Sequence, residues 1–206
     1  MMRYTGLLLI SLLMFGGTAY AQTRLPEIPL DQYTAEQKKA AQEFELVRKK
    51  APWGPFAMLM YSPELMNNAR AMGDYLRYRS SFDSVLSEFA ILITAREWTQ
   101  DYEWYVHYPI AIKAGLKPEI AQALKEGRRP EGMSQDEAIV YDFTIELQRN
   151  KRVSDATFAK TEKRFGKKGA VDLAGIAGYY TFLAMEMNMA KHQIPAGAER
   201  LPRFPD

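Results

Sequence analysis

Apolar and polar positions along this chain follow one another as helices, with no strand-like alternation and no hairpin turn sequence. Residues 34–50 have a mostly polar face, whereas residues 85–98 are apolar on most faces and residues 170–191 nearly all round. A helix that is apolar on most faces is usually buried at the centre of a protein. The pattern therefore predicts an all-α fold, a compact helical bundle with 85–98 at its centre. Helices are expected over about 34–50, 62–79, 85–98, 101–114, 117–127, 134–150, 154–166 and 170–191.

Local start and stop signals set the bounds of several of these helices. Thr34 and Gln37 have the spacing of a capping box, in which each side chain accepts a hydrogen bond from a free backbone amide. Asp101 is expected to cap the helix that runs to Ala114, and Gly115 follows it at the position where helices commonly stop. Gly166 is expected to end the helix that begins near residue 154.

The first 21 residues have the three parts of a secretory signal peptide. Arg3 supplies the positive start, residues 6–15 form an apolar run, and residues 19–21 read Ala-Tyr-Ala, a small-x-small cleavage pattern. The apolar run is much shorter than the roughly 20 residues that cross a bilayer, so no stable membrane insertion is expected. Cleavage between Ala21 and Gln22 would leave residues 22–206 as one helical domain, periplasmic or secreted.

Composition excludes several kinds of chemistry. The chain has no cysteine, so it can form no disulfide, thiolate zinc site, iron–sulfur cluster or redox-active cysteine pair. The formal net charge is only +2, because 27 basic residues are nearly balanced by 25 acidic ones, and both kinds are spread along the chain. This balance gives no reason to expect nucleic acid as a partner. Catalysis would have to use oxygen and nitrogen groups.

Residues 95–107 hold the densest cluster of reactive side chains. Glu103 and His107 are four residues apart, so on a helix they share a face, where the carboxylate can orient the imidazole for proton transfer. Glu88 lies on the preceding helix, and an antiparallel turn near Gln100 would place it about one turn from level with His107. A lone carboxylate in so apolar a segment is costly to bury without a partner. Glu88, Glu103 and His107 are therefore the candidate catalytic residues.

Two neighbouring side chains are candidates for binding a substrate. Arg96 has the geometry to hold a carboxylate, although it could equally cap the end of its helix. Trp104 could contact substrate or belong to the core. Neither a cofactor nor a metal is required, and a two-histidine, one-carboxylate metal site stays open only as an alternative.

The stretch from Ser87-Glu88-Phe89-Ala90 through residues 103–107 to residues 111–116 resembles the carboxymuconolactone decarboxylase family, which includes the alkylhydroperoxidase D-like proteins. The resemblance covers about residues 61–125, with extra helices on both sides. The peroxidase branch carries a glutamate, a Cys-x-x-Cys pair and then a histidine. On this chain these positions fall on Glu88, Gln100, Glu103 and His107, so both cysteines are absent. Thiol-dependent peroxidase activity is therefore excluded.

The decarboxylase branch of this family also lacks the cysteine pair and keeps Glu-x-x-x-His before a glycine-containing helix end, a pattern that Glu103, His107 and Gly115 match. The resemblance implies a helical bundle that assembles into homo-oligomers, trimers or hexamers, with the site near a subunit interface. The decarboxylase acts inside the cell, whereas this chain is expected to be exported, so we expect a different substrate.

Together these observations predict an exported lyase or isomerase that transfers protons on a small carboxylated or lactone substrate. His107 would be the acid or base, Glu103 would orient it, and Glu88 would complete the proton relay. Two alternatives remain. The first is a binding or assembly protein on the same scaffold without catalysis, and the second is a metal-dependent oxidoreductase with His107 as a ligand.

Overall fold

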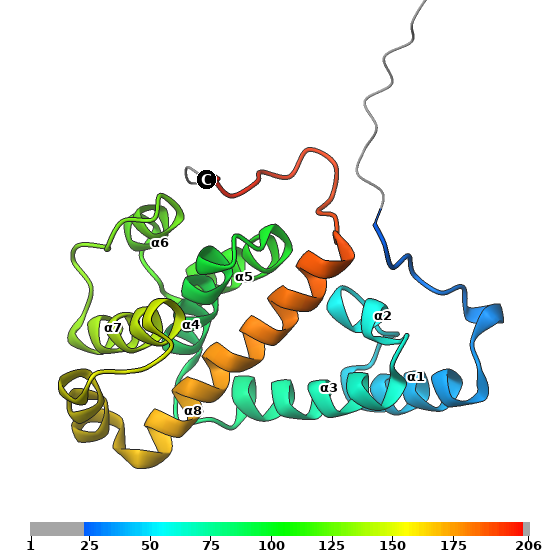
Figure 1. The fold of residues 1–206 in the computed structure, drawn as a ribbon, viewed down its shortest axis with the longest axis horizontal. Helices are drawn as coiled ribbons and strands as arrows, with labels where there is room; N and C mark the ends of the chain where they lie inside the picture. Colours follow the sequence, from blue (N-terminus) through cyan, green and yellow to red (C-terminus); the bar gives the residue numbers. More distant parts are fainter. Residues whose placement is uncertain (1–22, 204–206) are drawn as a thin grey trace, which may run out of the picture.

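The computed structural model describes residues 23–203 (Figure 1). The predicted signal peptide, residues 1–21, lies outside the described residues. Within them, every regular element is helical, which confirms the predicted fold class. The elements are η1 (Leu30–Gln32), α1 (Ala35–Arg48), α2 (Pro55–Leu59), α3 (Pro63–Tyr78), α4 (Ser84–Glu97), α5 (Asp101–Ala114), α6 (Pro118–Lys125), α7 (Gln135–Asn150) and α8 (Asp155–Ala190).

Side-chain caps account for where several of these helices begin. The predicted capping box of α1 is present, because the Gln37 amide donates to the Thr34 hydroxyl and the Gln37 side chain accepts from the Thr34 amide. The expected cap of α5 is wrong by one residue: Gln100 is the N-cap, and its side chain accepts from the Tyr102 amide. Asp101 is already the first helical residue, and its carboxylate pairs with Arg203 instead.

Helix α4 is central, as its composition predicts. It packs against α5, α6, α7 and α8, and every residue from Leu86 to Arg96 is buried. A tight turn at residues 98–100 reverses the chain, so α5 returns along α4. The two helices thus bring the acidic residue of α4 and the reactive cluster of α5 into contact.

Helix α8 crosses the middle of the molecule. The chain leaves helical geometry at Gly166, with φ 71° and ψ 174°, so the predicted break is present as a sharp bend within α8. Beyond the bend, α8 runs between α3 on one side and α4 and α7 on the other (Figure 1). Its inward face carries buried residues that include Tyr179, Tyr180 and Met187.

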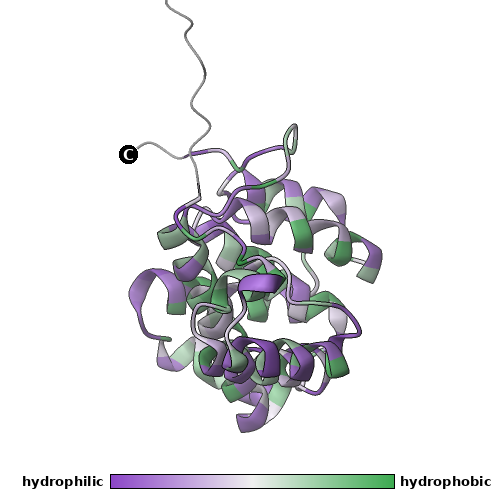
Figure 2. Ribbon diagram, turned by 90° about the vertical axis from the view of Figure 1, so that its right-hand side faces the viewer, coloured by the Kyte–Doolittle hydropathy of each residue, from purple (hydrophilic) through white to green (hydrophobic). Residues whose placement is uncertain are grey.

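The packed faces form one hydrophobic cluster with contributions from α1 to α8, and polar residues lie on the outer faces of the helices (Figure 2). The burial of these apolar faces is the main source of stability in a fold of this kind. Among residues 23–203, no helix combines the length and apolar character needed to cross a membrane.

Candidate active site

A pocket of about 250 Å³ lies between the α1–α2 segment, α3, α5 and α8. This volume is near the lower end for small-molecule sites, about 300 Å³. Most of its wall is apolar or aromatic, with a few charged groups. The lining residues are Arg48, Lys50, Trp53, Pro55, Phe56, Arg77, Tyr102, Glu103, Val106, His107, Ile110, Tyr179, Tyr180, Leu183 and Met187.

Three ionisable side chains from three helices are linked by hydrogen bonds beside this pocket, and two of them, Arg77 and His107, line it. His107 Nδ1 lies 2.5 Å from Glu88 Oε2, and Arg77 donates to Glu88 Oε1 over 3.2 Å. Burial by itself raises the pKa of Glu88, but the hydrogen bond with His107 Nδ1, together with the charge and hydrogen bond of Arg77, outweighs it and holds the pKa below its ordinary value. Glu88 is therefore ionised at neutral pH.

The ionised state of Glu88 decides which nitrogen of His107 carries a proton. A carboxylate can only accept hydrogen bonds, so Nδ1 must donate, and Nε2 of the neutral ring is left with its lone pair. His107 lines the pocket and is only 7% exposed. When a carboxylate accepts a hydrogen bond from Nδ1 of a histidine, the ring is oriented to accept a proton at Nε2. The carboxylate then stabilises the resulting imidazolium.

Glu103 has a different role from the one predicted, because Glu88 and not Glu103 bonds to His107. Glu103 is 3% exposed and lines the pocket, and neither of its carboxyl oxygens has a hydrogen-bond partner within residues 23–203. Burial raises the pKa of Glu103 well above its ordinary value. Burial without a hydrogen-bond partner therefore favours the neutral carboxylic acid, which can donate a proton but cannot orient a neighbouring imidazole by charge.

Cross-helix packing explains why the pairing differs from the expectation. Glu88 and His107 lie on the facing sides of α4 and α5, and Arg77 of α3 adds a positive charge beside the carboxylate. The spacing estimate placed Glu88 about one turn from level with His107, and the structure closes that gap. Two partners offset the cost of burying the Glu88 charge, whereas Glu103 avoids that cost by staying protonated.

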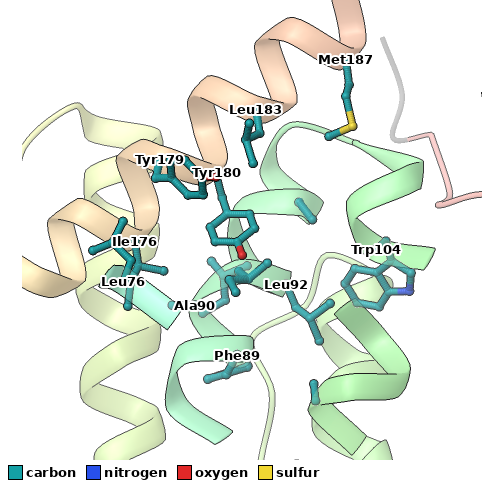
Figure 3. Packing of buried hydrophobic residues seen from close by; sticks show 14 of the residues in the cluster. Leu76, Phe89, Ala90, Leu92, Trp104, Ile176, Tyr179, Tyr180, Leu183 and Met187 are labelled. Atoms are coloured by element: carbon teal, nitrogen blue, oxygen red, sulfur yellow. The ribbon is translucent and has the colours of Figure 1, made fainter. Parts of the chain in front are cut away.

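The two predicted substrate-binding residues do not line this pocket. Arg96 is buried at the end of α4, where it donates to the Thr99 hydroxyl. Trp104 belongs to the hydrophobic core and stacks on Tyr108, with ring centroids 6.0 Å apart. Figure 3 shows Trp104 apart from Tyr179 and Tyr180, the two tyrosines of α8 that line the pocket.

The sequence analysis missed several residues of the site. Tyr180 packs its ring edge against His107, with centroids 5.1 Å apart, and burial raises its pKa well above the ordinary value, so its phenol stays neutral. Arg77 and Arg48 come from helices on the N-terminal side of the molecule. Both lie far from His107 along the chain and on other helices, so no local sequence pattern could have identified them.

The structure offers no ready-made metal centre. Within residues 23–203, no group of three or more histidine, aspartate or glutamate side chains is arranged to hold an ion. His107 has one of its two nitrogens committed to Glu88.

Gly54 lies between two residues that line the pocket, Trp53 and Pro55, and has a backbone conformation that favours glycine. Gly54 has φ 56° and ψ −130°, and an added Cβ would lie 2.6 Å from the Tyr102 hydroxyl oxygen. We expect Gly54→Ala to lower the free energy of unfolding by about 2–3 kcal/mol, because it combines backbone strain with overpacking. Urea unfolding measures this loss. The matched control is Gly178→Ala in α8, where an added Cβ meets nothing within 4 Å. Equal stability of the two variants would contradict the prediction.

Comparison with known proteins adds information on the fold. No protein-family model and no curated sequence relative matches this chain. Among solved structures, the chain is similar to an uncharacterized peroxidase-related protein from a Silicibacter species, with a TM-score of 0.68 and 14% identity, over 89% of this chain and 97% of that one. It is also similar to an alkylhydroperoxidase AhpD core, an uncharacterized peroxidase-related protein from Ralstonia eutropha, with a TM-score of 0.65 and 16% identity, over 86% and 95%.

These two neighbours share the helical arrangement over nearly their whole length, which goes well beyond the 65 residues or so in which the sequence resemblance lies. At 14% and 16% sequence identity, this similarity establishes a shared fold and carries no information on function. The protein therefore has the alkylhydroperoxidase D-like helical fold.

Proposed function

We propose that this protein is a lyase or isomerase that transfers a proton on a small carboxylated or lactone substrate in the pocket lined by Glu103 and His107. One observation carries the proposal: Glu88 Oε2 lies 2.5 Å from His107 Nδ1, and a second carboxyl group, Glu103, lines the same pocket buried and without a hydrogen-bond partner among the described residues. The pKa of Glu88 is lowered and that of Glu103 is raised. Two carboxyl groups whose surroundings push their pKa values apart are a common arrangement for acid–base catalysis.

The three groups would divide the chemistry among them. His107 Nε2 takes a proton from the substrate, and the negative charge of Glu88 stabilises the imidazolium that forms. Glu103 delivers its carboxyl proton to the atom on which negative charge develops. In an isomerisation, the proton leaves one substrate atom for His107, and another arrives from Glu103. In a decarboxylation, the bond to the departing CO₂ breaks, its electron pair stays on the substrate carbon, and a proton from Glu103 or the imidazolium neutralises it.

The pocket wall suits such a reaction. Leu183, Met187, Val106 and Ile110 contribute apolar side chains to the wall of the pocket, and apolar surroundings disfavour water. Charge interactions are stronger where water is excluded, so the Glu88 carboxylate acts on His107 more strongly than it would on a surface helix. Thiol peroxidase chemistry is not available, because the chain has no cysteine. Export behind a signal peptide and assembly into homo-oligomers stay predictions.

NMR of the ring nitrogens of His107 tests this proposal directly. The chain has only two histidines, so a His192→Gln variant assigns the signals. We expect the neutral ring to carry its proton on Nδ1 in the wild type and to lose this preference in Glu88→Ala, because the acceptor that fixes the proton is gone.

The same spectra, recorded with a panel of small lactones and carboxylates, should show a shift at Nε2 with at least one compound, and consumption of that compound would identify the reaction. A ring protonated at Nε2, or one indifferent to every compound, would rule out the acid–base mechanism and favour a scaffold without catalysis.

A further inference from the structure

The mouth of the pocket carries positive charges that the proton-transfer groups do not use. Arg77 is neutralised by Glu88, but Arg48 and Lys50, at the end of α1 and just beyond it, line the same pocket. Both cations lie against the ring of Trp53, with Lys50 Nζ 3.4 Å and the Arg48 guanidinium carbon 5.9 Å from its centroid. Arg48 and Lys50 therefore sit on one aromatic platform.

Lys50 has no carboxylate partner among residues 23–203. Its side chain is exposed and is held only by the face of Trp53. An ammonium group fixed at a pocket entrance without a counterion is free to bind an incoming anion.

Arg48 is largely buried, with 10% of its side chain exposed. One nitrogen pairs with Asp74 over 2.8 Å, but Asp74 also pairs with Arg70 over 2.9 Å, so this single carboxylate serves two guanidinium groups. Arg48 Nε is buried and has no hydrogen-bond partner within the described residues. Because Arg48 shares its carboxylate with Arg70, part of its positive charge stays uncompensated, and this charge favours an anionic group in the pocket that Arg48 lines.

The other lining groups favour the same kind of ligand. Among the described residues, Glu103 is the only carboxyl group that lines the pocket, and burial raises its pKa well above the ordinary value, which disfavours a negative charge that would offset Arg48 and Lys50. Trp53, Phe56 and Tyr102 also line the pocket and provide flat aromatic surfaces. Planar ring systems pack well against such surfaces.

We propose that Arg48 and Lys50 form an anion-binding subsite that holds the carboxylate of a flat, ring-containing organic acid, with its ring against Trp53 and Phe56. This inference rests on the proposed function, since it orients the substrate so that its ring extends from the mouth towards His107. It also gives the α1–α2 segment, which lies outside the resemblance at residues 61–125, the role of selecting the substrate.

Calorimetric titration with benzoate tests the subsite, with benzamide as the neutral probe of the same shape. In the wild-type full chain we expect benzoate to bind and benzamide to bind at least tenfold more weakly. Lys50→Gln should raise the Kd for benzoate about three- to tenfold, and Arg48→Gln about tenfold or more, since each removes one charge-assisted contact. The matched control is Lys38→Gln, an exposed lysine of α1 outside the pocket that gives the same change in net charge.

Equal Kd values for benzoate in Lys38→Gln and Lys50→Gln would overturn the subsite, and so would equally weak binding of benzoate and benzamide to the wild type. Lys50 is exposed, so its variant tests the subsite even if Arg48→Gln does not fold. The ring nitrogens of His107 separate the two proposals. If the variants weaken benzoate binding but Nδ1 of His107 shows no dependence on Glu88, the subsite stands and the acid–base function fails.

Discussion

Replacing Glu88 with alanine is expected to lower the free energy of unfolding at pH 7 by about 3–5 kcal/mol, the cost of removing one partner from a buried ion pair. The substitution leaves the Arg77 guanidinium without its carboxylate and His107 Nδ1 without its acceptor. Urea unfolding followed by circular dichroism measures the loss.

The matched control on the same helix is Glu97→Ala. Glu97 pairs with Arg149, whose side chain is half-exposed, so the expected loss is about 1 kcal/mol or less. Losses of equal size for the two variants would show that the Glu88 pair is no stronger than a surface pair.

The effect of Glu88 should also depend on pH. The folded pKa of Glu88 lies below its unfolded value, so the stability it contributes is present above the unfolded pKa, about 4.3. That contribution is lost as pH falls through the folded pKa. The difference between wild type and Glu88→Ala should therefore be largest near neutrality and shrink in acid.

Glu103→Gln is expected to have the opposite effect and to stabilise the protein at neutral pH. Burial raises the folded pKa of Glu103 well above the unfolded value, so folding keeps a proton that the unfolded chain releases. The stability linked to this proton is fully present below the unfolded pKa and is lost as pH rises towards the folded pKa. The loss is at most about 1.4 kcal/mol for each pH unit.

Glutamine keeps the shape of the protonated acid but cannot ionise, so the variant should gain on the wild type as pH rises above about 4.3. Unfolding free energies measured at several pH values give this slope. Glu137→Gln is a control: Glu137 is also buried, but its carboxylate accepts from the Ser134 amide in a capping box, so losing that charge should not stabilise. A Glu103→Gln difference that does not change with pH would mean that Glu103 is ionised in the folded protein.

The two glutamates illustrate how far a sequence can predict a site. The sequence pattern identified Glu88, Glu103 and His107 as candidate reactive residues, and in the structure Glu103 and His107 line the pocket while Glu88 contacts His107. It assigned the orienting role to Glu103, because residues four apart on one helix are neighbours whatever the rest of the fold does. The partner from another helix was less predictable, since a shift of one turn, about 5.4 Å, decides whether two side chains touch.

The walls of the pocket were harder to predict than the ionisable residues beside it. Arg96 lies in the reactive cluster of the sequence but does not line the pocket, whereas Arg48, 59 positions before His107, does. A pocket between helices is lined by whichever faces the packing turns inwards. The order of residues along the chain therefore gives little information about its walls.

By itself, the sequence determined the helical fold, the buried position of residues 86–96 and the absence of thiol chemistry, because helix periodicity, apolar composition and lack of cysteine are local properties of the chain. Only the tertiary structure decided that Glu88 is the ionised partner of His107, that Glu103 is a neutral acid and that Arg48 and Lys50 stand at the mouth. Charge state and pairing depend on which groups from other helices surround a side chain and on how far they exclude water.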